Sequence, residues 1–242
     1  MTQTVLITGV TGGIGGAIAE TLLETGSNVF GTGRGPDRVQ AAKARLQAQY
    51  GEGRVDVVAR DLADEGAAEA LAAAAIERFG RIDALVNAAG LVTLAPTHDV
   101  TLQGFNEQMN VLFRGPFLLT AAVLRHMVAA GGGVIVNIGS AAAERGAPRM
   151  AVYGAAKAAL ANFTRTIAAE YAGQGVRAVC ISPGAVETAL MDKVMLAMIQ
   201  KRTPLKRLAA PREVAALVRY VLSPDAAYMT GSNLLLDGGV TL

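Results

Sequence analysis

Side chains that build metal sites and disulfides are scarce in this sequence. Its 242 residues include one cysteine, two histidines and no tryptophan. Cys180 alone cannot form a disulfide within the chain, and with His98 and His126 it is too small a set for a structural zinc ion, so no metal site is expected. Charge is scarce as well: charged residues make up 17 %, and the 22 basic and 20 acidic residues are scattered along the chain. No nucleic-acid partner is therefore expected.

Long hydrophobic runs are also missing. No apolar run approaches the roughly 18 residues of a membrane span, and the amino-terminal MTQTVLITG lacks the features of a leader sequence. We therefore expect a cytoplasmic chain with no membrane partner. Apolar residues nevertheless make up 52 % of the sequence, which predicts a sizeable core. No linker rich in proline, glycine or serine interrupts the chain, so a single domain over residues 1–242 is expected.

Short β-branched runs alternate with alanine- and leucine-rich stretches of helical length. This alternation predicts right-handed crossovers and a doubly wound, Rossmann-type α/β fold, with one parallel sheet of about seven strands and helices on both faces. Ligands of such folds bind at the carboxyl ends of the strands. The expected strands are 4–9, 27–33, 55–61, 82–90, 133–140, 176–184 and 233–239, and the expected helices include 14–25, 64–79, 102–130 and 151–173.

The first expected strand ends in a glycine-rich turn, TGVTGGIG (8–15), which a helix follows. Glycines let the backbone approach a pyrophosphate, whose charge is met by backbone N–H groups and the positive helix end. The spacing G-x-x-x-G-x-G differs from the commoner G-x-G-x-x-G. A dinucleotide site is favoured over a plain tight turn, and its candidate residues are Gly9, Thr11, Gly12, Gly13, Ile14 and Gly15.

The run YGAAK places Tyr153 and Lys157 four residues apart, on one face of an expected helix. A free phenol has a pKa of about 10. A neighbouring ammonium stabilises the phenolate, so we expect Lys157 to lower the pKa of Tyr153 toward the range where proton transfer is efficient. Taken alone, the pair is better explained as a partly exposed tyrosine next to a lysine whose aliphatic chain packs on the helix surface. The catalytic interpretation therefore depends on other motifs.

Eight short motifs together carry a family resemblance over essentially the whole chain. In order they are TGVTGGIG, DLAD, NAAG, Asn110 in MNVLFRG, Ser140 in VNIGS, YGAAK, PGAVET and YMTGSNLLLDGG. The sequence resembles the single-domain short-chain dehydrogenases/reductases, and among them the 3-oxoacyl-[acyl carrier protein] reductases. The resemblance implies an oxidoreductase whose amino-terminal half binds a nicotinamide cofactor and whose carboxyl-terminal half is catalytic.

The resemblance implies four catalytic residues. Tyr153 would exchange a proton with a ketone or secondary alcohol, and Ser140, thirteen residues earlier, would orient the substrate oxygen. Lys157 would activate Tyr153 and hydrogen-bond the nicotinamide ribose. Asn110 would hold a water that links the lysine to solvent. The cofactor carries the hydride, while the protein supplies position and protons.

The residues after the second expected strand favour NADP over NAD. An acidic side chain there selects NAD, whereas an arginine accommodates the 2′-phosphate of NADP. Gly33 stands where the NAD-type aspartate of the family would be, Arg34 follows it, and Arg38 adds positive charge. Against this, many NADP-dependent members carry a basic residue in the glycine turn, where this chain has Gly12.

Three further strand ends would contact the cofactor. Asp61 and Leu62 would contact adenine, and the segment after the fourth strand would lie along the nearer ribose, although Ala88 replaces the commoner second asparagine. The segment after the sixth strand would flank the nicotinamide. The candidates after the fourth strand are Asn87, Ala88, Ala89 and Gly90, and those after the sixth strand are Pro183, Gly184, Val186 and Thr188.

The substrate is less well determined by the sequence. Residues 189–208 fall where the family has a lid, and Leu190, Met191, Met195, Leu196 and Met198 make it apolar and adaptable. They could instead only pack against the core. A free, largely apolar substrate is favoured over an acyl carrier protein, because MVAAGGGV (127–134) and EYAGQGV (170–176) lack the basic residues, at Gln174 for example, that would dock that acidic partner.

Two other interpretations remain open. One is 3-oxoacyl-[acyl carrier protein] reductase activity, and the other is a catalytically idle NADP-binding sensor. The helices expected at 102–130 and 151–173 are apolar on more than one face. By the resemblance, such helices pair across a two-fold axis, which predicts a homo-oligomer, a tetramer.

Overall fold

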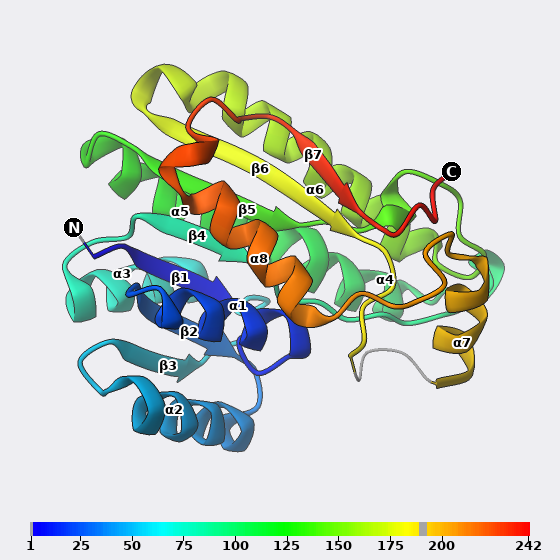
Figure 1. Cartoon of the computed structure of the whole chain (residues 1–242), viewed down its shortest axis with the longest axis horizontal. Coiled ribbons are helices and arrows are strands. Elements are labelled where there is room, and N and C mark those ends of the chain that lie inside the picture. The colour runs from blue at the N-terminus through cyan, green and yellow to red at the C-terminus, as the bar shows by residue number, and fades with distance from the viewer. Residues whose placement is uncertain (1, 189–192) are drawn as a thin grey trace.

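Seven apolar segments pair side by side in one parallel sheet, in the order β3-β2-β1-β4-β5-β6-β7 (Figure 1). The computed structural model describes residues 2–188 and 193–242. The predicted doubly wound sheet of seven strands is confirmed. The strands are β1 (Thr4–Thr8), β2 (Asn28–Gly33), β3 (Val55–Ala59), β4 (Ala84–Asn87), β5 (Gly133–Ile138), β6 (Val176–Pro183) and β7 (Asn233–Leu236).

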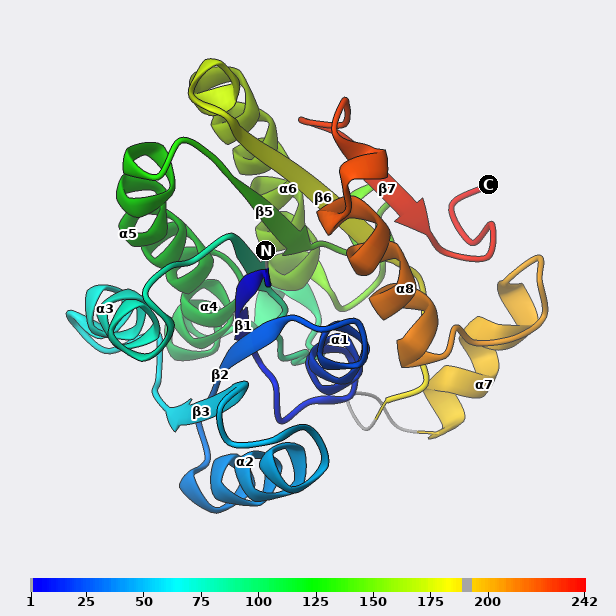
Figure 2. The same cartoon turned by 60° about the vertical axis from the view of Figure 1, so that its left-hand side comes forward.

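Helices cover both faces of the sheet, with α1, α2 and α8 on one side and α3, α5 and α6 on the other (Figure 2). Side chains alternate along a strand, and β1 supplies both layers. Val5 and Ile7 join the core beneath α1 and α8, whereas Leu6 joins the core beneath α3 and α5. The helices are α1 (Gly13–Glu24), α2 (Pro36–Tyr50), α3 (Ala67–Phe79), α4 (Leu102–Met109), α5 (Gly115–Ala129), α6 (Ala151–Tyr171), α7 (Lys193–Arg202) and α8 (Pro211–Leu222).

The helix expected over 102–130 is interrupted, contrary to prediction. A π turn, Asn110–Arg114, separates α4 from α5. Pro116 has no N–H and therefore cannot make the hydrogen bond of a regular helix. The Gly115 N–H donates to the carbonyl of Asn110, five residues earlier, as in a π-helix. The apolar pattern of the sequence runs through this point without a break, so it gave no sign of the π turn. The turn widens the helix where the candidate residue Asn110 lies.

This helical stretch is also apolar enough to span a bilayer by length and composition. Among the described residues it alone passes that test, with 28 residues, Leu102–Ala129, and a mean hydropathy of 1.3 in its most apolar window. Half of that window, 50 %, is buried inside the protein. Its apolar face packs on α3 and α6, so the hydropathy is that of a helix in the core of the fold.

The strand order places a crevice at the carboxyl edge of the sheet. Successive strands run outward from β1 to β3 on one side and from β4 to β7 on the other. The loops after β1 and β4 therefore part in opposite directions, which opens a space between them where ligands bind in this architecture. Most of the candidate residues follow the carboxyl ends of β1 to β6.

Candidate active site

The glycine turn after β1 lies tightly against the end of β2. The N–H groups of Gly9 and Val10 donate to the carbonyl of Thr32 at 2.8 and 3.1 Å. Gly9 has a φ of +74°, and a Cβ at Gly15 would lie 2.3 Å from the Gly9 carbonyl oxygen. Both positions therefore require glycine. The turn leads directly into α1, so its free N–H groups and the positive end of the helix face the crevice.

The same turn is tied to the loop after β4. The hydroxyl of Thr8 accepts hydrogen bonds from the N–H groups of Ala88 and Ala89, each at 3.0 Å. Thr188 lies on the other side, because a Cβ on Gly13 would come within 2.8 Å of its methyl group. Three loops predicted to hold one cofactor thus meet around a single backbone turn.

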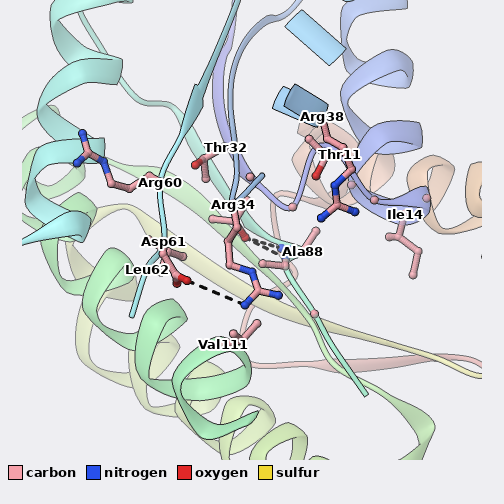
Figure 3. Close-up of a pocket in the computed structure, with 18 of the residues that line it drawn as sticks. Thr11, Ile14, Thr32, Arg34, Arg38, Arg60, Asp61, Leu62, Ala88 and Val111 are labelled. Carbon is pink, nitrogen blue, oxygen red and sulfur yellow. Dashed lines mark hydrogen bonds and ion pairs between the residues drawn. The ribbon is translucent and has the colours of Figure 1, made fainter. Parts of the chain in front are cut away.

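Together these loops line a cleft of about 320 Å³ (Figure 3), a size typical of small-ligand sites. It includes most of the predicted cofactor residues and four that the sequence analysis did not name as candidates, Thr8, Thr32, Arg60 and Val111. Each of the four is next in sequence to a residue that the sequence analysis did consider. The lining residues are Thr8, Gly9, Thr11, Gly12, Gly13, Ile14, Gly15, Thr32, Gly33, Arg34, Arg38, Arg60, Asp61, Leu62, Ala88, Ala89, Gly90, Val111 and Thr188.

Three exposed arginines border this cleft. Arg34 lies at its centre, with its guanidinium 4.0 Å from the carboxylate of Asp61 (Figure 3). Arg38 lies beside Thr11, whereas the side chain of Arg60 extends away from both other arginines (Figure 3). Positive charge is therefore concentrated next to the end of β2, and no carboxylate occupies position 33.

The serine, tyrosine and lysine predicted to be catalytic lie at the carboxyl end of β5. Ser140 follows the strand, and its Oγ accepts the N–H of Ala142 at 3.1 Å. Tyr153 and Lys157, on α6, are both buried, with exposed fractions of 9 % and 4 %. The Lys157 ammonium donates to the carbonyl of Ile138 at 2.6 Å.

The electrostatics of Tyr153 differ from the expectation. Burial raises the pKa of its phenol, and a hydrogen bond with Ser140 only partly offsets this. The predicted lowering by Lys157 is not found, since the ammonium points to Ile138 and lies 6.0 Å from the centre of the Tyr153 ring. Burial also lowers the pKa of Lys157 to about 8.

Asn110 lies on the π turn next to Val111, which lines the cleft. The π turn packs against α6, the helix of Tyr153 and Lys157. Among residues 2–188 and 193–242, no hydrogen bond joins the Asn110 side chain to Lys157. The fold thus brings Asn110 to the catalytic helix without a hydrogen bond to Lys157.

Asn87 is not placed as predicted. Its side chain is buried, and its amide donates to Thr120 at 3.2 Å and to Asn137 at 2.8 Å. Because side chains alternate along a strand, this last residue of β4 points toward α5 and away from the cleft. Ala88, Ala89 and Gly90 do line the cleft. Asn87 therefore holds β4 to its neighbours, and only the segment after it can lie along a ribose.

The segment after β6 is tied to two later parts of the chain. The Gly184 N–H bonds to the carbonyl of Leu236 at 3.0 Å, and Val186 forms an isolated parallel bridge with Ala209. Pro183 is the last residue of β6 and is buried. None of these three lines the described cleft, in contrast to Thr188.

The predicted lid is only partly described. Leu190 and Met191 lie outside the described residues, and Met195 belongs to α7. Leu196 is half-buried and Met198 is exposed. Ala142 and Met150 pack with Tyr153 in a small apolar cluster. The described surroundings of the tyrosine are thus largely apolar.

The two segments considered for carrier docking lie at the opposite edge of the sheet. Residues 127–134 and 170–176 precede β5 and β6, and the Gly133 N–H bonds to the Gly175 carbonyl at 3.2 Å. The length of β5, about 20 Å, separates them from Ser140. In this chain, therefore, neither segment lies beside Ser140, and their lack of basic residues does not describe the entrance to the site.

Comparison with known proteins identifies close similarity over the whole length. The family described as Enoyl-(Acyl carrier protein) reductase matches residues 9–241. D-threitol dehydrogenase of Mycolicibacterium smegmatis is 36 % identical over 98 % of this chain and 92 % of that protein. A 3-oxoacyl-[acyl-carrier-protein] reductase of Vibrio cholerae is also 36 % identical, over 97 % and 96 % of the two chains.

Solved structures show the same architecture. A blue fluorescent protein from a metagenomic library, in complex with NADPH, has a TM-score of 0.92 and 31 % identity, covering 99 % of this chain and 98 % of that one. A short-chain dehydrogenase/reductase mutant of Serratia marcescens has a TM-score of 0.92 and 30 % identity, with the same coverage.

Proposed function

Because this chain belongs to the short-chain dehydrogenase/reductase family and is an oxidoreductase of alcohols and ketones, we propose that it transfers hydride between NADP(H) and a ketone or secondary alcohol, with Tyr153 as general acid/base. The observation that carries the proposal is the meeting of two sites at one edge of the sheet. The glycine cradle lies at the end of β1, and Ser140, Tyr153 and Lys157 lie at the end of β5.

The described residues fit a dinucleotide. Side chains would not fit in the glycine turn: a Cβ at Gly15 would meet the Gly9 carbonyl, one at Gly9 would meet Ala89, and one at Gly13 would meet Thr188. Because the turn is bare of side chains, a phosphate could approach its N–H groups closely. Ala88–Gly90 and Leu62 would contact ribose and adenine. When bound, the cofactor supplies or accepts the hydride.

The side chains around Tyr153 would direct the proton. Ser140 accepts a hydrogen bond from the Ala142 N–H and also bonds with Tyr153. A substrate oxygen placed between Ser140 and Tyr153 would take over the Ser140 hydroxyl proton. The raised pKa of Tyr153 keeps its phenol protonated near neutral pH. Such a phenol suits proton donation to a carbonyl oxygen, and hence reduction, whereas oxidation of an alcohol would be favoured by alkaline pH.

NADP is favoured over NAD by the charge at the end of β2. Arg34 and Arg38 border the cleft there, and Gly33 offers no carboxylate to a free 2′-hydroxyl. The structural relative in complex with NADPH is consistent with this preference. The Asp61 carboxylate lies 4.0 Å from the Arg34 guanidinium, which is exposed beside the cleft.

We favour a free, largely apolar substrate. The apolar cluster of Ala142, Met150 and Tyr153 supports this choice. Carrier-bound 3-oxoacyl reduction is the second candidate, because the Vibrio cholerae reductase is as similar as the threitol dehydrogenase. The test that separates these two candidates compares kcat/KM for a 3-oxoacyl group attached to its carrier with kcat/KM for the same group on a short thioester. A carrier advantage of a hundredfold or more that is lost at high salt would favour the second.

The direct test is a panel of ketones and secondary alcohols assayed with NADPH and NADH. Turnover of at least one carbonyl compound with oxidation of NADPH is expected. Tight NADPH binding without turnover of any compound would support the sensor interpretation instead. A cytoplasmic location and a homotetramer complete the proposal.

A further inference from the structure

Gly33 ends β2 at the position where this fold reads the adenosine ribose, yet its backbone does not require glycine. It is not among the glycines with positive φ. The constraint is lack of space. A Cβ at this position would lie 2.9 Å from Thr11 Oγ1, 3.0 Å from Thr11 Cγ2 and 3.2 Å from Val39 Cγ2.

Neither neighbour can easily withdraw. Val39 is packed in the core with an exposed fraction of 4 %. The turn that carries Thr11 is pinned by two hydrogen bonds to the Thr32 carbonyl and by one from the Gly12 N–H to the Gly9 carbonyl, at 2.9 Å. The same closeness recurs two residues earlier on the same face of β2, where a Cβ at Gly31 would lie 2.9 Å from Val10.

Rotation of the threonine does not relieve the crowding. A β-branched side chain fills two of its three staggered positions. Both heavy branches of Thr11 lie within 3.0 Å of the Cβ position of residue 33. Any rotamer therefore leaves at least one branch in a crowded position, whereas a serine could turn its single branch away.

We propose that Thr11 is a specificity-determining residue, because it prevents position 33 from carrying the carboxylate that would select NAD and keeps the space beside Arg34 open for a 2′-phosphate. This inference rests on the proposed NADP dependence. It implies that replacing Gly33 with aspartate cannot by itself change the cofactor preference from NADP to NAD. Thr11 must change as well.

The test combines Gly33→Asp with Thr11→Ser and, as a matched control, Thr11→Val. Valine has the shape of threonine without its hydroxyl, so it retains the crowding. Dissociation constants for NADPH and NADH are measured from cofactor fluorescence, together with Tm. Gly33→Asp alone should lower Tm by several degrees and weaken NADPH binding without a gain for NADH. Adding Thr11→Ser should recover part of the lost Tm, since the Val39 contact remains, and should tighten NADH binding roughly tenfold or more. Adding Thr11→Val should do neither.

The outcomes separate the inference from the proposed function. A wild-type protein that binds NADH more tightly than NADPH would overturn NADP dependence. Suppose that the wild type prefers NADPH but that Gly33→Asp alone binds NADH as tightly as Gly33→Asp combined with Thr11→Ser. This result would overturn only the role of Thr11. If Gly33→Asp does not fold, the loss of Tm caused by Gly33→Ala is compared in three backgrounds: wild type, Thr11→Ser and Thr11→Val. Relief by serine alone supports the inference, and equal losses in all three contradict it.

Discussion

At the scale of single residues, Lys157 is a buried ammonium held 2.6 Å from the Ile138 carbonyl, and burial lowers its pKa to about 8. A lysine pKa lower in the folded than in the unfolded chain means that the unfolded chain binds more protons between the two values. The contribution of this group to the free energy of unfolding therefore rises with pH from about 8 to about 10.5.

This shift predicts that one lysine titrates apart from the rest. In the cofactor-free protein with 13C-labelled lysine, one ε-methylene signal should have a midpoint near pH 8, and it should vanish in Lys157→Met. A midpoint near 10.5, the ordinary lysine value, for the signal that vanishes in Lys157→Met would show that the ammonium is solvated.

Arg34 is the residue on which the cofactor preference depends most. Arg34→Asp replaces a cation beside the cleft by a second carboxylate near Asp61. NADPH binding should weaken roughly tenfold or more, and NADH should gain relative to it. Arg60→Asp is the matched control, because it makes the same charge change on a side chain that extends away from Arg34 (Figure 3). Equal effects of the two variants on the NADPH dissociation constant would exclude a specific role for Arg34.

At the scale of elements, the turn between β1 and α1 depends on glycine at one crowded position. Gly15→Ala would place a methyl group 2.3 Å from the Gly9 carbonyl oxygen. We expect a lower Tm and loss of NADPH binding, measured by thermal melts and titration. Gly53→Ala is the control, since no atom lies within 4 Å of its Cβ position. An unchanged NADPH affinity in Gly15→Ala would contradict the assignment of the turn as the phosphate cradle.

The strands, the crossovers and the glycine turn could be predicted from local patterns, since periodicity and turn residues report directly on the backbone. Two features could not. The π turn at Asn110 depends on the missing N–H of Pro116 and on how Gly115 packs against Leu62. The inward direction of Asn87 depends on partners, Thr120 and Asn137, that lie far along the chain. The pKa of Tyr153 likewise depends on burial, which a pair of residues four apart does not reveal.

At the scale of the whole molecule, two of the surfaces that carry exposed apolar side chains are a helical face and a sheet edge. Leu102, Phe105 and Phe117 are exposed on α4 and α5, and the ring of Phe117 makes a tilted contact with that of Phe163 on α6, with ring centres 4.9 Å apart. Leu235 is exposed on β7, an edge strand of the sheet. Exposed apolar patches and unpaired strand edges mark association surfaces.

Two separate surfaces predict a tetramer with two kinds of two-fold contact. Light scattering at micromolar concentration should give four times the mass of the 24.9 kDa chain. Phe117→Glu, on the helical face, should reduce the mass to that of a smaller species, whereas Tyr228→Glu, at an exposed residue on neither α4 nor α5, should not have this effect on the helical contact. A monomeric wild-type protein would refute the prediction.

Proton transfer by Tyr153 is the central step of the proposed reaction, and Tyr153→Phe tests it most directly. The measurement is kcat for reduction of a ketone that the wild type turns over, together with the dissociation constant for NADPH. Loss of the hydroxyl should lower kcat by about 10²–10⁴-fold and leave NADPH binding nearly unchanged, because the glycine cradle lies on a different loop. A variant that keeps more than about a tenth of the wild-type kcat would show that Tyr153 is not the proton donor.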